Sequence, residues 1–148
     1  MKKFILPLLA SMFLLAGCTE NARVVTHYYS VEPNQWQQSI TTYDDGTYDV
    51  NYYYASFRNI DIDRMVIDNG VVLAYYIDAE GRDNILPYTL YMKGTDGAGN
   101  TFYYQERIEF DITEEVITFK IKDSDFHTSQ SMQNIGRMKF KVCAISNY

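Results

Sequence analysis

Histidine is scarce in this chain of 148 residues, which holds only His27 and His127. Histidine is the usual group for proton transfer and nitrogen ligation near neutral pH, so few side chains are available for either task. Asp123, His127 and Ser129 lie too close in sequence to be expected to converge as a triad, and no Gly-x-Ser-x-Gly elbow is present. We therefore predict no catalytic residues and no enzymatic activity, with a hydrolase as the least favoured alternative.

Acidic residues are plentiful, but no stretch of them has the spacing of a metal site. An EF-hand requires regularly spaced Asp residues and a terminal Glu. Aspartate that bonds its own backbone in a turn explains these residues more simply. We therefore predict no metal and no cofactor at the acidic stretches, which are Asp44-Asp45, Asp61 with Asp63, Asp96, and Asp123 with Asp125.

Positive charge is in short supply, because 13 Lys and Arg residues stand against 19 Asp and Glu residues, for a formal net charge of −6. A negative chain repels the phosphates of nucleic acids and the headgroups of anionic lipids. We therefore predict no nucleic-acid partner and no electrostatic adhesion to a membrane.

The sequence also lacks an apolar run long enough to cross a bilayer. The run from Phe4 to Leu15 follows Lys2 and Lys3, and its length is that of a signal-peptide core. It ends in Leu15-Ala16-Gly17-Cys18, which resembles the lipobox of bacterial lipoproteins. In that family the peptide is cut before the cysteine, whose thiol and new amino group are then acylated. The resemblance implies that residues 1–17 are removed and that Cys18 carries lipid.

An acylated Cys18 would hold the protein at a membrane, because two or more acyl chains give stable anchoring. We expect residues 18–23 to form a short tether, with a root-mean-square reach of roughly 12 Å, ahead of one domain over residues 24–148. The expected location is the cell envelope, at the outer membrane or cell surface. Cys143 would then be the remaining thiol, so no intrachain disulfide could form.

Proline is rare while aromatic residues are abundant, with 3 Pro against 14 Tyr and 8 Phe, and this balance favours strands. The segment Ile60–Asn69 instead has apolar residues at helical spacing, so we predict about two helical turns with Asp61 as N-cap. Alternation and turn signals predict strands over Val24–Val31, Trp36–Thr42, Thr47–Phe57, Val71–Asp78, Ile85–Met92, Thr101–Ile112, Val116–Lys122 and Met138–Ile145.

One strand pair can be given a register, because a slip by one residue would turn an apolar row to solvent. With a loop over Thr113–Val116, the predicted partners are Ile112 with Ile117, Phe110 with Phe119, Ile108 with Ile121, and Glu109 with Lys120.

Two segments should interrupt the regular strands. Pro87 inside a strand indicates a sheet edge or a bulge. The Gly-rich segment Lys93–Asn100 is expected to be the most flexible loop.

About eight short strands separated by turn signals are typical of an all-β fold, which we predict to be a single antiparallel β-sandwich, immunoglobulin-like, with one short helical turn. An eight-stranded lipocalin-like barrel is the alternative. The segments Val66–Tyr76, Leu86-Pro87-Tyr88 and Phe140-Lys141-Val142 together resemble a group of small Bacteroidetes lipoproteins of unknown function. That resemblance implies an envelope-anchored β-sandwich and supplies no catalytic residues.

The most distinctive feature is tyrosine at strand positions that should face away from the core, namely Tyr53, Tyr76, Tyr91 and Tyr103. Tyrosine offers apolar area and a hydrogen-bonding tip at low entropic cost, which suits recognition of glycans or proteins. We therefore predict a non-enzymatic binding or adhesion domain that uses this surface or a loop such as Lys93–Asn100. One alternative is a structural subunit that joins an envelope assembly through an edge strand.

Overall fold

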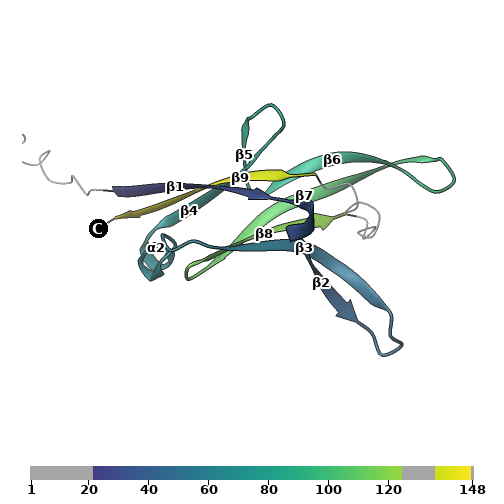
Figure 1. Ribbon diagram of the computed structural model, residues 1–148, viewed down its shortest axis with the longest axis horizontal. Coiled ribbons are helices and arrows are strands. Elements are labelled where there is room, and N and C mark those ends of the chain that lie inside the picture. Colours follow the sequence, from purple (N-terminus) through teal and green to yellow (C-terminus); the bar gives the residue numbers. More distant parts are fainter. Residues whose placement is uncertain (1–21, 125–135, 148) are drawn as a thin grey trace, which may run out of the picture.

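The structure is a computed structural model that describes residues 22–124 and 136–147. Two antiparallel sheets pack face to face (Figure 1): sheet A has the strand order β1-β9-β4-β5, and sheet B has the order β2-β3-β8-β7-β6. The strands of the described residues divide between two sheets, so the predicted all-β sandwich is confirmed and the barrel is excluded. The elements are β1 (Ala22–Val31), η1 (Pro33–Gln35), β2 (Gln37–Thr42), β3 (Tyr48–Arg58), α2 (Arg64–Asn69), β4 (Val71–Ile77), β5 (Asp83–Ile85), β6 (Tyr88–Thr95), β7 (Thr101–Thr113), β8 (Val116–Asp123) and β9 (Met138–Asn147).

Sheet A is built around β9, which pairs with β1 on one side and β4 on the other. Because side chains alternate along a strand, Phe140, Val142 and Ala144 point inward and are at most 3% exposed. Lys139 and Lys141 lie on the opposite face, as the alternation in the sequence predicts.

In sheet B the predicted register between β7 and β8 is confirmed, including the pairs Phe110 with Phe119 and Glu109 with Lys120. The connection is tighter than the predicted four-residue loop, since Thr113 and Val116 also pair. Glu115 takes up the turn with a φ of 58°, in the left-handed region that few non-glycine residues adopt.

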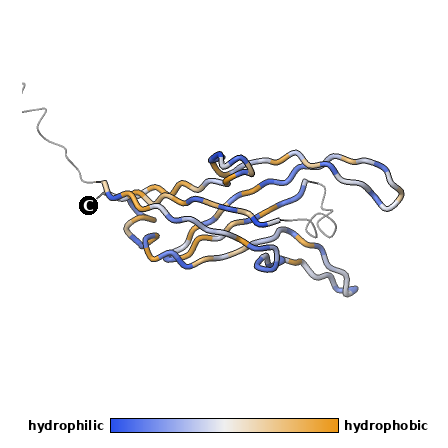
Figure 2. Tube along the Cα trace, turned by 45° about the horizontal axis from the view of Figure 1, so that its top comes forward, coloured by the Kyte–Doolittle hydropathy of each residue, from blue (hydrophilic) through white to orange (hydrophobic). Residues whose placement is uncertain are grey.

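The core lies between the sheets, where Phe119 of β8 stacks on Phe140 of β9 with ring centroids 4.0 Å apart. Both rings are fully buried, and Tyr29 of β1 meets Phe119 edge-on at 5.6 Å. Figure 2 shows hydrophobic residues recurring along the strands of both sheets. Phe102 lies outside this buried cluster, in the β6–β7 hairpin, where its ring covers Gly94 so closely that an added Cβ would lie 2.4 Å from Cζ.

The predicted strand Ile85–Met92 is wrong as a single strand. The chain leaves sheet A after β5 and enters sheet B at β6, and the Leu86–Pro87 peptide bond between them is cis. Proline has no N–H to donate to a ladder, so strand pairing stops there. Both strands lie at sheet edges, as the proline predicts.

The predicted short helix is confirmed, but it begins only at Arg64, and Asp63 rather than Asp61 is its N-cap. Asp63 accepts a hydrogen bond from the backbone N–H of Val66 at 2.9 Å. The chain first turns at Asn59, whose side-chain oxygen accepts from the Asp61 N–H at 3.0 Å. Asp61 consequently points to β1, where it pairs with Arg23 and His27.

The predicted loop over Lys93–Asn100 is wrong in extent, because residues up to Thr95 belong to β6. Asp96 organises the remaining turn: its Oδ1 accepts from the backbone N–H groups of Ala98 at 3.0 Å and Asn100 at 2.7 Å. Such backbone capping is the ordinary role of aspartate in a turn.

The molecule has two different ends (Figure 1). The start of β1, the end of β9, helix α2 and the β7–β8 turn lie together at what we call the tether end. The β2–β3 and β6–β7 hairpins project at the opposite, hairpin end. Ala22 and Arg23, predicted to be tether, already belong to β1. Among the described residues, no helix has the length and apolar character needed to cross a bilayer.

Candidate functional site

Tyr53 does not face outward, so the prediction that it belongs to an exposed platform is wrong. Its side chain is 5% exposed, and its hydroxyl accepts a hydrogen bond from Gln38 Nε2 at 3.1 Å. The register between β2 and β3 shifts so that Ser39 pairs with Tyr52 while Ile40 pairs with Val50. The extra residue in β3 reverses the inside and outside positions beyond it, which the sequence alternation did not reveal.

Tyr76 also faces the interior, again contrary to the prediction. Its half-buried ring stacks on Tyr88 at 6.1 Å and lies 6.1 Å from the ring of Phe140. Burial, followed by the charge of Asp78, raises the pKa of the Tyr76 hydroxyl. Tyr76 is therefore part of the packing between the sheets.

Tyr91 and Tyr103 do point away from the core, and they are 82% and 75% exposed. They lie on neighbouring strands, where Tyr91 pairs with Gln105 and Tyr103 with Lys93. The two tyrosines are thus diagonal neighbours on the outer face of sheet B, at a separation that aromatic side chains span.

A shallow depression of about 350 Å³ lies beside these two rings. Two of its lining residues are joined by two hydrogen bonds: the Ser124 N–H donates to the Gln105 carbonyl at 2.9 Å, and the Gln105 N–H donates to the side-chain Oγ of Ser124 at 3.1 Å. None of the lining side chains carries a charge at neutral pH. We call this site the tyrosine pocket, and its lining residues are Tyr91, Tyr103, Tyr104, Gln105 and Ser124.

Beside the tyrosine pocket, the outer face of sheet B carries a ladder of paired charges. Lys122 and Arg107 both bind Glu109, and the Lys120 ammonium lies 5.0 Å from the ring centroid of Tyr52. The register shift in β3 places Tyr52 and Tyr54 on this outer face as well. The tyrosine pocket is therefore an uncharged site beside a charged ladder.

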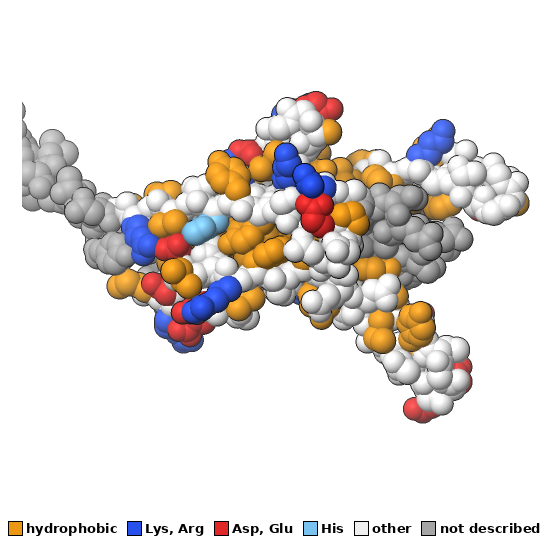
Figure 3. Space-filling view, in the orientation of Figure 1, with side chains coloured by type: hydrophobic (Ala, Val, Ile, Leu, Met, Phe, Trp, Pro, Cys, Tyr) orange, Lys and Arg blue, Asp and Glu red, His pale blue; other side chains and the backbone are white. Residues whose placement is uncertain are grey.

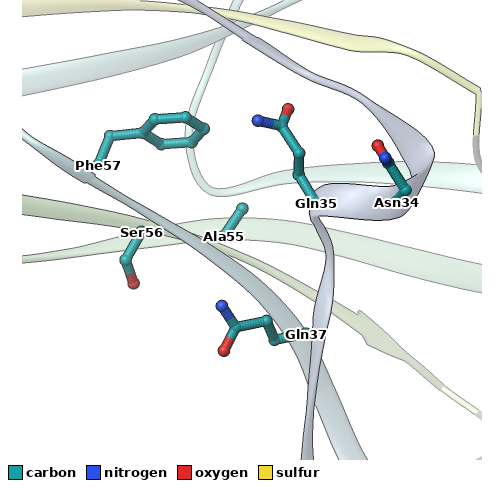
Figure 4. Close-up of a pocket in the computed structure, with 6 residues that line it drawn as sticks. All are labelled: Asn34, Gln35, Gln37, Ala55, Ser56 and Phe57. Atoms are coloured by element: carbon teal, nitrogen blue, oxygen red, sulfur yellow. The ribbon is translucent and has the colours of Figure 1, made fainter.

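A second depression, of about 300 Å³, lies where η1 and the start of β2 pass over β3 (Figure 4). Its lining is rich in amides, which the sequence analysis did not single out. Some of its polar atoms are already used, because Gln35 Oε1 accepts from the Glu32 N–H at 2.8 Å and Ser56 bonds Thr118 at 2.9 Å. The lining residues are Asn34, Gln35, Gln37, Ala55, Ser56 and Phe57.

Several of the described aspartates act in turns and ion pairs. Asp45 accepts from both the backbone and the hydroxyl of Thr47, and the hydroxyl bond lowers the pKa of Asp45 most. Within residues 22–124 and 136–147, no three acidic, His or Cys side chains come together as a metal site. Asp125 lies outside the described residues.

His27 and Cys143 each contact a neighbouring polar side chain. His27 Nε2 bonds Asp61 Oδ2 at 2.8 Å, and half-buried Cys143 contacts the Thr26 hydroxyl at 3.5 Å. Cys18, the predicted lipidation residue, and His127 lie outside the described residues.

Glu106 is a buried carboxylic acid that the sequence analysis did not single out, at 5% exposed. Burial raises the pKa of Glu106, and the charge of Asp123, the residue of β8 that pairs with it, raises this pKa further. The alternation in the sequence could have indicated this burial, because Glu106 is two residues from Ile108 in the same strand and therefore faces the same side of the sheet. Glu106 belongs to β7, as do Tyr103 and Gln105, but it is not among the residues that line the tyrosine pocket.

No protein-family model matches the chain, and neither a curated protein nor a solved structure is significantly similar to it.

Proposed function

We propose that this chain is a bacterial envelope lipoprotein, anchored through Cys18, that binds a neutral glycan in the tyrosine pocket. The sequence Leu15-Ala16-Gly17-Cys18 supports the anchor. The observation that carries the binding role is the pair Tyr91 and Tyr103, whose exposed rings flank a depression.

The chemistry of the pocket favours a glycan over a charged ligand. A sugar presents a weakly polar C–H face beside hydroxyl groups, and tyrosine presents an apolar ring with a hydrogen-bonding tip. Gln105 and Ser124 add amide and hydroxyl groups to the same site. An uncharged lining offers no ion pair to an anionic or cationic partner, so specificity would rest on stacking and neutral hydrogen bonds.

The position of the pocket suits an anchored protein. Tyr103 lies near the start of β7 and Ser124 follows the end of β8, on the side of the hairpins and away from the tether end (Figure 1). A domain held at Cys18 would present this pocket away from its membrane.

The test is a glycan array probed with the acylated protein in detergent micelles, followed by titration of each glycan that binds. Tyr91→Ala and Tyr103→Ala should each weaken binding by tenfold or more, a loss of ~1.4 kcal/mol that is ordinary for a central aromatic contact. Tyr48→Ala is the matched control, because Tyr48 is 60% exposed on the other hairpin. An empty array, or equal losses in all three variants, would overturn the proposal.

A structural role is the second candidate, supported by the ten-residue edge strand β1, which has β9 on one side only. Long edge strands can add a strand from another subunit. Light scattering after size-exclusion chromatography decides between the two: a stable assembly of copies favours the structural role, and a strict monomer counts against self-assembly.

A further inference from the structure

Most of the exposed apolar side chains described are sorted by type between the two ends of the molecule, with Tyr28 on β1 as an exception. Tyr43, Tyr48, Tyr91 and Tyr103 are exposed on the projecting hairpins. The exposed aliphatic side chains, apart from Ile40 and Ile85, lie at the tether end. We call this group the aliphatic patch, and its members are Val24 (60% exposed), Ile60 (64%), Met65 (45%) and Val71 (52%).

The patch is built from three parts of the chain. Val24 and Val71 flank Ile145 on the outer face of sheet A, because each pairs with Ile145 in register. Met65 lies on α2, which packs against β9 and β4. Ile60 stands in the turn between β3 and α2, one residue before the Asp61 that binds Arg23. Segments far apart in sequence thus place aliphatic groups at one end.

Each arginine described at this end pairs with a carboxylate, while Asp63 caps α2. Arg23 binds Asp61, Arg64 binds Asp68 at 2.9 Å, and Arg58 binds Glu115 at 2.8 Å. In Figure 3 hydrophobic side chains stand among these charges at the tether end. An apolar patch with paired charges can approach a low-dielectric surface at less cost than one with isolated charges.

The short length of chain between Cys18 and β1 indicates which surface the aliphatic patch would contact. β1 starts at Ala22, so Thr19, Glu20 and Asn21 alone separate it from Cys18. Four Cα–Cα steps span at most about 14 Å even when fully extended. If Cys18 is acylated, the aliphatic patch is held at the surface of the bilayer.

We propose that the aliphatic patch is a membrane-contact surface that rests in the lipid interface and orients the domain, and this inference rests on the proposed acylation of Cys18. Aliphatic groups suit the boundary between headgroups and acyl chains. The contact need not be strong, because a short tether gives an effective concentration on the order of millimolar. A contact too weak to recruit free protein would then be populated in the anchored protein.

The experiment uses spin labels on the acylated protein in phosphatidylcholine vesicles. Labels are placed through Met65→Cys and Tyr48→Cys in a Cys143→Ser background, and collisions with oxygen are compared with collisions with a nickel chelate. The label at 65 should show a severalfold higher oxygen-to-nickel ratio than the label at 48. The paired change Val24→Thr with Val71→Thr should lower the ratio at 65, whereas the control Ile40→Thr should not.

Each other result overturns the inference in a recognisable way. Mass spectrometry of the N-terminal peptide shows whether Cys18 is acylated, and an unmodified Cys18 removes the anchor and the membrane contact together. If Cys18 is acylated and the label at 65 shows the low oxygen-to-nickel ratio of a label in water, the membrane contact is refuted while the anchor stands. Dipolar broadening between labels at 65 would show that a second copy, rather than lipid, covers the patch.

Discussion

Replacing Phe119 should reveal how strongly the two sheets are joined. Phe119 and Phe140 come from different sheets, are both fully buried, and stack with centroids 4.0 Å apart and an interplanar angle of 11°. Phe119→Ala should therefore cost about 4 kcal/mol of unfolding free energy, the usual loss for a buried Phe. At roughly 4 °C per kcal/mol, the melting temperature would fall by about 15 °C.

Urea unfolding followed by the fluorescence of Trp36 suits this measurement, because Trp36 is the one tryptophan and packs against the core. Phe119→Leu keeps an apolar side chain and should cost about 1.5 kcal/mol. Tyr103→Leu, at an exposed position, is the control and should change stability by less than about 0.5 kcal/mol.

A double-mutant cycle separates ring stacking from simple burial. Phe119→Leu and Phe140→Leu should show a coupling of about 1 kcal/mol, the ordinary value for an aromatic pair. A loss below about 1 kcal/mol for Phe119→Ala, or a coupling near zero, would refute the packing of the sheets through these rings.

Further predictions concern pH and backbone space. Glu106→Gln should stabilise the fold at neutral pH, because burial, then Asp123, raises the pKa of Glu106 above its ordinary 4.5 and disfavours its charged form. In urea unfolding this advantage should disappear below about pH 4, where the acid is protonated in both states, and a gain independent of pH would contradict the cause. Asp78→Asn should destabilise above pH 4 and approach wild type as the pH falls, because hydrogen bonds from Arg82 lower the pKa of Asp78 to about 2; a constant difference would disprove this linkage. Gly70→Ala should lower the free energy of unfolding by about 1–3 kcal/mol, since the added Cβ would lie 2.4 Å from the Ile145 carbonyl oxygen. The control Gly97→Ala, where an added Cβ meets open space, should change this free energy little. Equal melting temperatures for the two variants would contradict the prediction.

The sequence predicts the strands and one register well, because each depends on local alternation. The pairs Ile108 with Ile121 and Phe110 with Phe119 follow from matching apolar rows around a turn. The inward positions of Phe140 and Val142 follow from the same rule. Such patterns require no knowledge of which strand lies next to which.

The sequence does not predict the orientation of a side chain where that orientation depends on contacts between distant segments. The extra residue in β3 depends on its pairing with β2, and it reverses the orientation expected for Tyr53. In β4 nearly every residue is apolar, so alternation gave no guide to Tyr76, which turns inward to meet Tyr88. Tyr91 and Tyr103 were placed correctly because their strands alternate cleanly.

Hydroxyl-radical footprinting of the acylated protein tests the proposed ligand surface most directly. Oxidation of each tyrosine would be measured by mass spectrometry, with and without a mixture of neutral oligomers of glucose, mannose, xylose and galactose. The account predicts that Tyr91 and Tyr103 become protected while Tyr28 and Tyr48, which are also largely exposed at 71% and 60%, stay unchanged. Protection of Tyr28 or Tyr48 without protection of the pocket, or no protection at all, would contradict it.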